Sequence, residues 1–161
     1  MILLYSHGIE NTELIGNWLV SNGPHQNHNL VTNNFVKNKN NIFNKIENIW
    51  STSSLTTAEA IDISKYNKFC IDMDYYIPNQ SNTGQGIYWG LTHNSYVDAV
   101  IGNYLVIETT QITNYKYCIN INEVNGNLFP FIEIFNDHTM IPYNGYIINT
   151  YIYLYKVWLE I

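Results

Sequence analysis

The sequence predicts an all-β fold, an antiparallel β-sandwich of two sheets. The clearest sign is strict alternation, in which Phe69, Ile71 and Met73 point to one side of a strand and Asp72 and Asp74 to the other. Aromatic residues make up 15% of the chain and charged residues only 12%, which disfavours an all-α domain. With 161 residues and 46% hydrophobic content, residues 1–161 are expected to form a single domain.

In the N-terminal half, short apolar runs are separated by turn residues. We expect strands at residues 2–5, 14–20, 42–50 and 69–77. Residues 42–50 also fit a helical stripe, but their Asn-rich flanks have low helix propensity and favour a strand. In the fourth strand, Phe69, Ile71 and Met73 should face the core, because a register slip by one residue would bury Asp72 and Asp74.

The C-terminal half follows the same pattern after a polar loop at residues 78–86. We expect strands at residues 87–92, 97–101, 104–109, 115–122, 128–135 and 147–159. Gly102-Asn103 has the composition of a two-residue hairpin turn. Both faces of residues 147–159 carry large apolar groups, which predicts a central strand covered on both sides. About eight to ten strands at this spacing are typical of a sandwich or barrel.

Charge composition argues against several classes of partner. The chain has no arginine, and seven lysines against thirteen acidic residues give a net charge of −6. Proteins that bind nucleic acids or anionic membranes need clustered basic residues, so we expect neither partner. The apolar run at the N-terminus is too short for a signal peptide, and no run approaches the ~20 residues of a spanning helix. A neutral glycan or another protein fits this composition better.

The two cysteines, Cys70 and Cys118, both fall on the more polar side of their strands. This position favours two free thiols in a reducing cytoplasm, although an even number of cysteines also permits one disulfide.

Residues with catalytic or metal-binding chemistry are few and scattered. Asp72 and Asp74 share a strand face, Asp137-His138 lies at a turn, and His25 is three residues from His28. Paired carboxylates on a strand are usually a solvated face, a loop His needs a nucleophile that is not evident, and two histidines alone specify no metal. We therefore expect no catalytic residue, no metal site, no cofactor and no enzymatic activity.

The region from residue 85 to residue 98 is the best candidate for ligand binding. Sugar rings are bound by aromatic faces together with short polar side chains, and both kinds cluster there. The predicted ligand-binding residues are Tyr88, His93, Asn94, Tyr96 and Asp98. Trp89 lies in the same region, but its place in the Ile87-Trp89-Leu91 alternation favours the core.

Three short phrases resemble a known class of viral domain. The opening Leu4-Tyr5-Ser6-His7-Gly8-Ile9-Glu10, followed by Ile15-Gly16-Asn17-Trp18, resembles the start of virion-associated β-sandwich domains in phages of AT-rich, Gram-positive-type hosts. Asn17 stands where that phrase usually has Gly. The Ile61-Asp62-Ile63-Ser64-Lys65-Tyr66 turn is similar to one in the galactose-binding-like jelly roll, and the closing Val157-Trp158-Leu159-Glu160 also occurs in such proteins.

The resemblance implies a jelly-roll-like, non-enzymatic structural protein of a bacteriophage virion. It would be a tail, baseplate or fibre component, located in the virion and in contact with a host-surface glycan as receptor. Its expected partners are other virion proteins or itself, as a homo-oligomer. A carbohydrate-binding, lectin-like module is the first alternative, and a capsid decoration or head-fibre protein is the second. A glycan-processing enzyme is a weaker alternative, because no carboxylate pair is convincingly placed.

Overall fold

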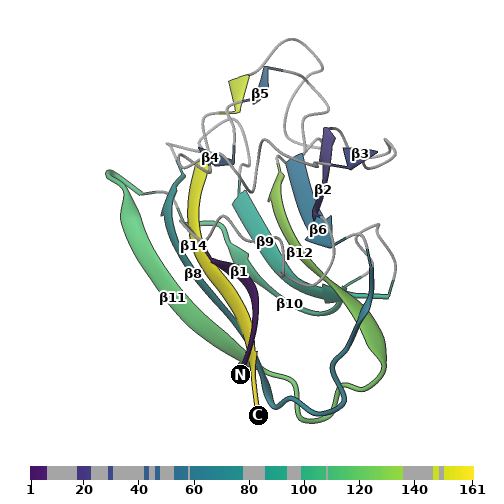
Figure 1. Cartoon of the computed structure of the whole chain (residues 1–161). Coiled ribbons are helices and arrows are strands. Elements are labelled where there is room, and N and C mark those ends of the chain that lie inside the picture. The colour runs from purple at the N-terminus through teal and green to yellow at the C-terminus, as the bar shows by residue number, and fades with distance from the viewer. Residues whose placement is uncertain are drawn as a thin grey trace.

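The computed structural model describes residues 1–6, 18–22, 29–30, 42–43, 46–47, 53–57, 59–77, 86–93, 99–107, 109–135, 147–148 and 151–161. Every helix or strand assigned in these residues is a β-strand, and two antiparallel sheets form the body of the molecule (Figure 1). The predicted all-β sandwich is therefore confirmed. None of the described segments is a helix that could cross a membrane.

The first sheet has five strands and contains both ends of the chain. Its order is β1 (Ile2–Ser6), β14 (Tyr151–Glu160), β8 (Lys68–Tyr76) and β11 (Thr113–Asn120), and β4 (Ile42–Phe43) also pairs with β14. Because β1 pairs with β14, the two termini lie side by side (Figure 1).

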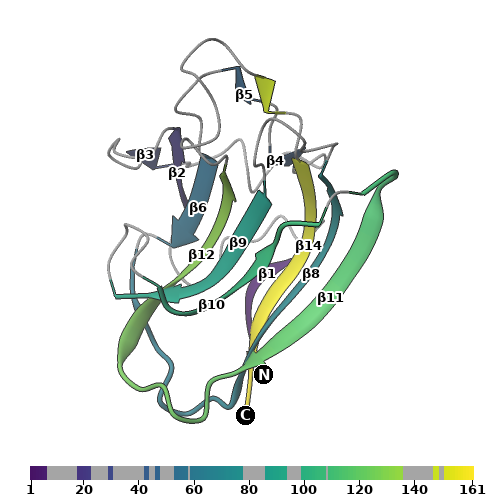
Figure 2. The ribbon, with the colours of Figure 1, turned by 180° about the vertical axis from the view of Figure 1, so that it is seen from behind.

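The second sheet has seven strands and is seen from behind in Figure 2. Its order is β10 (Ala99–Leu105), β9 (Gly86–Thr92), β12 (Asn127–Phe135), β6 (Ser53–Thr57), β2 (Trp18–Asn22) and β3 (Asn29–Leu30), with β7 (Ile61–Asp62) also paired to β12. A separate pair joins β13 (Ile147–Ile148) to β5 (Ile46–Glu47). Nine of these strands have five or more residues, which matches the expected number, and the other five have two residues each.

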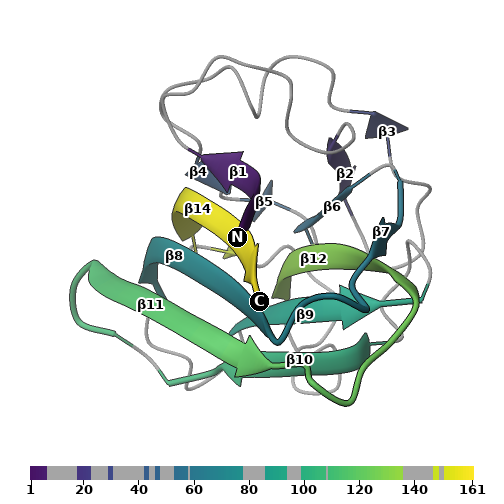
Figure 3. The same ribbon diagram turned by 60° about the horizontal axis from the view of Figure 1, so that its bottom comes forward.

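The core lies between the two sheets, which Figure 3 shows as facing layers. Phe69, Ile71 and Met73 of β8 are fully buried, and the Phe69 ring lies 5.6 Å from the ring of Trp89 on β9. Asp72 and Asp74 remain partly exposed on the opposite face. The alternation in β8 therefore predicted the inward side chains correctly, and Trp89 belongs to the core as expected.

A β-bulge in β14 changes which residues of this strand face the core. The register with β8 shifts between Leu154 and Lys156, so Tyr155 is an extra residue. Ile152 and Leu154 are buried before the bulge, and Val157 and Leu159 are buried after it. Without the bulge, Lys156 would face the core. The expectation of a single strand covered on both faces is wrong in part, because residues 147–159 contain two strands and Tyr155 is 37% exposed.

The hairpin predicted at Gly102-Asn103 is wrong, because β10 runs without a turn from residue 99 to residue 105. Gly102 lies opposite Gly90 of β9. A Cβ atom at Gly102 would lie 2.6 Å from the ring of Tyr88, so the glycine makes room for that ring. Its small size therefore serves packing and not a turn.

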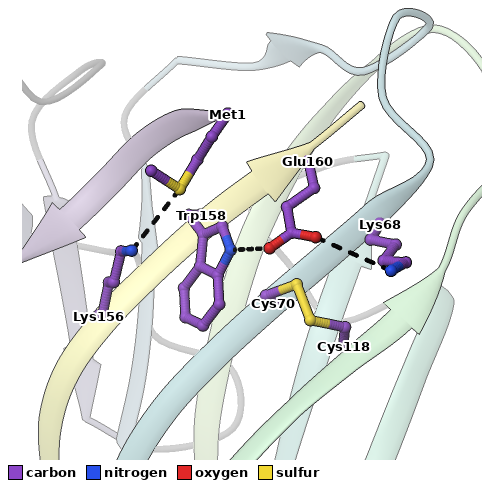
Figure 4. Close-up of a disulfide and its surroundings, with 7 residues drawn as sticks. All are labelled: Met1, Lys68, Cys70, Cys118, Lys156, Trp158 and Glu160. Atoms are coloured by element: carbon purple, nitrogen blue, oxygen red, sulfur yellow. Dashed lines mark hydrogen bonds and ion pairs between the residues drawn. A yellow bond between two sulfur atoms is a disulfide. The ribbon is translucent and has the colours of Figure 1, made fainter.

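Cys70 and Cys118 form a disulfide, which corrects the expectation of two free thiols. The two residues are direct partners in the β8–β11 ladder, with Cα atoms 4.0 Å apart. Their pairing depends on the register between strands 48 residues apart in sequence, which local pattern does not reveal. The disulfide lies beside Trp158, whose indole N–H donates to Glu160 at 2.7 Å (Figure 4).

Other expectations differ from the structure in smaller ways. Strand β2 begins at Trp18, and residues 14–17 of the predicted strand lie outside the described residues. Residues 42–43 and 46–47 are strands, as favoured over a helix, but they are short. Strand β6 at Ser53–Thr57 was not predicted, because its Ser- and Thr-rich sequence resembles a loop.

Candidate ligand-binding face

Tyr88, one of the predicted ligand-binding residues, lies between Tyr104 and Glu133 on the seven-stranded sheet. Its direct cross-strand partners are Tyr104 on β10 and Glu133 on β12. Because side chains alternate along a strand, these three residues share the face opposite to the buried Trp89. They form a row across three neighbouring strands on the outward face of the sheet.

The aromatic rings in this row become more exposed toward the sheet edge. The rings of Tyr88 and Tyr104 are stacked, with centroids 3.8 Å apart and an interplanar angle of 5°. Phe131 of β12 contacts Tyr88 edge-on at 5.0 Å. Phe131 is buried, Tyr88 is partly exposed, and Tyr104 is 57% exposed. The Tyr104 ring is therefore exposed to solvent, and it is supported by the Tyr88 and Phe131 rings, which are packed against the protein.

Two glycines form the floor beneath these rings. Gly90 and Gly102 face each other across β9 and β10, and the Tyr88 ring lies over Gly102. A Cβ at Gly90 would lie 2.0 Å from the Ile101 carbonyl oxygen, so the backbones approach closely there. Side chains at these positions would displace the rings or the strands. The glycines thus set the height at which Tyr88 lies on the sheet.

Glu133 gives the row a carboxyl group with unusual acidity. Burial raises the pKa of Glu133 to about 7. The one ion pair among the described residues joins Lys68 to Glu160, so no described lysine neutralises Glu133. Burial also raises the pKa of Tyr88 to about 12, with smaller contributions from Tyr104 and Glu133. Near neutral pH, Glu133 can therefore either donate or accept a hydrogen bond from a bound polar group.

The other predicted ligand-binding residues have different outcomes. His93 is exposed and directly follows the end of β9. Asn94, Tyr96 and Asp98 lie outside the described residues. His25, His28, Asp137 and His138 also lie outside them.

Sequence reasoning missed two members of the row. The sequence pattern places Tyr104 at the start of a strand after a turn, and it gives Glu133 no role in binding. One signal for Glu133 was present, because it is the one carboxylate in the otherwise apolar run from residue 128 to residue 135. A charged residue inside such a run is rarely buried without a purpose.

A concave region lies apart from this row, near the turn between β11 and β12. It has a volume of about 340 Å³ and is lined by Ile101, Asn120, Asn122, Glu123 and Val124. The Asn120 side-chain oxygen accepts a hydrogen bond from the Asn122 N–H at 3.0 Å. The Asn120 amide therefore already has a partner within the protein. Among the described residues, neither Tyr88 nor His93 lines this pocket, and no aromatic ring does either.

Acidic groups on the outward face of the five-stranded sheet are held by neighbours. The Asn114 side chain donates to Asp74 at 2.9 Å, and the Tyr155 hydroxyl donates to the same carboxylate at 2.6 Å. Cys70, Cys118 and Glu160 lie close enough to hold a metal, but the disulfide leaves no thiolate to bind one (Figure 4). These groups stabilise the outward face of the five-stranded sheet.

Compared with models of known protein families, the chain matches none of them, and it matches no curated protein. The function is therefore inferred from the geometry of the Tyr88–Tyr104–Glu133 row and from the sequence resemblance.

Proposed function

We propose that this protein is a non-enzymatic structural component of a bacteriophage particle, part of a tail, baseplate or fibre, and that it binds a host-surface glycan. It would be located in the virion, assembled with other virion proteins or with itself. The observation that carries the glycan part is the Tyr88–Tyr104 stack, which ends in the exposed ring of Tyr104 on one side of Tyr88 and has the partly buried Glu133 on the other side.

The chemistry of the row suits a sugar. The apolar C–H face of a pyranose ring stacks on an aromatic ring, and its hydroxyls need donors and acceptors at the edge of that ring. Tyr104 offers the ring, and Glu133 and the Tyr88 hydroxyl offer polar groups. His93 follows the same strand, and Asn94, Tyr96 and Asp98 are expected to extend the site along the next segment.

The disulfide supports a role in a particle that leaves the cell. Disulfides persist on virion and cell surfaces and are rare in proteins that stay in a reducing cytoplasm. The Cys70–Cys118 bond thus agrees with the resemblance to virion-associated sandwich domains. It replaces the cytoplasmic thiols expected from sequence.

Two alternatives share the same fold. A lectin-like module without a virion role would use the same aromatic row, whereas a capsid decoration or head-fibre protein would need a broad contact with its own kind or with the shell. The genes beside this reading frame would separate them, because tail genes favour adsorption and capsid genes favour decoration.

The glycan part is tested by titrating host cell-wall polysaccharide into the protein in a calorimeter. Tyr104→Ala should weaken binding about tenfold or more, since loss of a stacked ring costs more than 1.4 kcal/mol. Tyr155→Ala, which removes an exposed tyrosine from the other sheet, should bind as the wild type does. Binding should change little with salt, because the ligand is neutral.

Equal binding by Tyr104→Ala and the wild type would reject the row as the site. A wild type that binds no fraction of the host surface would reject the glycan part altogether and leave a purely structural role.

A further inference from the structure

Strand β11 is an unprotected sheet edge in the described part of the chain. It pairs with β8 on one side, and no described strand pairs with its other side. Sheet edges offer rows of main-chain donors and acceptors to other strands, and proteins usually block them by shortness, bulges or charge. β11 has eight residues and pairs with β8 without any register shift.

The other edges of the two sheets are blocked in this way. Strand β3 has two residues, and β1 has five with a register shift between Leu3 and Tyr5. Strand β10 has a register shift between Ala99 and Ile101. Lys116 is the one charge on β11, but its ammonium group lies 5.7 Å from the Trp158 ring, over the sheet face and not along the edge. β11 alone is therefore long, regular and open among the described edges.

Exposed apolar side chains occur on β10, on β11 and on the segment between them. Figure 3 shows β10 and β11 on the same side of the sandwich, and the Asn103 amide on β10 donates to the Tyr115 hydroxyl on β11 at 2.9 Å. Tyr117 of β11 is 50% exposed. Val100 of β10 and Val106, Ile107 and Ile112 of the segment between β10 and β11 are also exposed.

The disulfide pair shows which residues of β11 direct their main-chain hydrogen-bonding groups toward the open edge. The 4.0 Å between the Cα atoms of Cys70 and Cys118 identifies a non-hydrogen-bonded pair. By alternation, the main-chain N–H and C=O groups of Cys118, Lys116, Asn114 and Asn120 point away from β8 and toward the open edge.

We propose that β11 pairs antiparallel with β11 of a second copy of this chain, around a two-fold axis at Tyr117. In this register Lys116 lies opposite Cys118 of the second copy, and Asn114 opposite Asn120. The two half-exposed Tyr117 side chains meet at the axis. The five-stranded sheets of the two copies join into one continuous sheet.

The neighbouring registers are less favourable. An axis at Lys116 would place two lysines directly opposite each other, which is repulsive. An axis at Cys118 would pair only residues 116–120, whereas the axis at Tyr117 pairs residues 114–120. The sequence of the edge is thus most self-complementary around Tyr117, which favours a second copy over an unrelated strand.

The first test compares two variants at one position by light scattering. Lys116→Pro removes an N–H that points outward, so it should leave the β8–β11 ladder intact and prevent pairing with a second copy. Lys116→Ala loses the same charge and keeps the N–H. We expect a dimer for the wild type and for Lys116→Ala, and half that mass for Lys116→Pro. A monomeric wild type, or a Lys116→Pro variant that is folded and dimeric, would overturn the proposal.

The second test reads the register and does not depend on the proline variant folding. Tyr117→Cys places two thiols opposite each other at the axis, at a non-hydrogen-bonded pair like that of the native disulfide. Mild oxidation should give a covalent dimer, whereas Thr113→Cys, on the same face of β11 but four residues from the axis, should not cross-link. A dimeric Tyr117→Cys protein that stays uncrosslinked would overturn the register and the interface.

This inference rests on the assembly part of the proposed function and not on its glycan part. A monomer that still binds the polysaccharide would reject the β11 interface alone, and a β11-linked dimer that binds no glycan would reject the ligand alone.

Discussion

Leu154 lies in the centre of the sandwich core, with 1% of its surface exposed. Leu154→Ala should lower the free energy of unfolding by ~2–5 kcal/mol, because it removes buried apolar volume and leaves a cavity. Ile161→Ala is the matched control, since Ile161 is 80% exposed and its loss should change stability by less than about 0.5 kcal/mol. Urea denaturation of both variants measures the difference, and equal effects would contradict the buried position of Leu154.

Glu133 should make the stability of the protein depend on pH near neutrality. Its pKa of about 7 in the folded state lies above the ordinary value of 4.5, so the folded protein holds the proton more tightly than the unfolded chain. The native state should therefore lose stability as pH rises from about 4.5 to about 7, on the order of 2 kcal/mol. Glu133→Gln should lack this loss.

The measurement is the difference between the unfolding free energies of the wild type and Glu133→Gln across this pH range. Taking the difference removes the opposite trend of groups such as Asp62, whose pKa is lowered chiefly by a hydrogen bond from the Ser64 N–H. A difference that does not change with pH would show that Glu133 titrates normally.

Strands β9 and β10 approach each other at Gly90 and Gly102, and these two positions should differ in how well they accept a larger side chain. At Gly90, an added Cβ would meet the backbone of β10, which cannot move without breaking the ladder. At Gly102, it would meet the far end of the Tyr88 ring, which can rotate. Gly90→Ala should therefore cost ~1–3 kcal/mol or more, and Gly102→Ala less. Thermal unfolding compares them, and a larger loss for Gly102→Ala would contradict this packing.

The disulfide ties the edge strand β11 to the central part of its sheet. Replacing both cysteines with serine should lower the free energy of unfolding by ~2–4 kcal/mol, because the bond restrains a long loop in the unfolded chain. Denaturation of the double variant without reductant measures this loss. The wild type in strong reductant should behave like the variant, and no change in either would show that the bond is absent in solution.

The alternation of apolar and polar residues predicted the positions of the long strands well, but it did not predict how these strands pair with one another. Alternation located β8 because it has one buried face, and β11 because its partly buried Tyr115 and Ile119 pack against the same core; it also identified the inward residues of β8. It did not reveal the bulge at Tyr155, the path of β10 through Gly102 or the disulfide, since each depends on a partner strand distant in sequence. Glu133 and Tyr104 were missed for the same reason, as only cross-strand register places them beside Tyr88.

Across the whole molecule, the five-stranded sheet depends on its first strand. β1 covers one side of β14, and its Leu4 is fully buried in the core. A chain without residues 1–6 should unfold at lower denaturant than Leu4→Ala, which itself should cost ~2–5 kcal/mol, because the deletion also exposes the edge of β14. Deletion and substitution that are equally stable would show that β1 contributes only one side chain.

The pairing of β1 with β14 also fixes an order of events during translation. Ile2 is synthesised well before its partner Leu159, which lies 157 residues later in the chain. The hairpin of β9 and β10 can close while synthesis continues, but β1 must wait for nearly the entire domain. For that interval the nascent chain carries an unpaired apolar strand, which is a natural binding site for a chaperone.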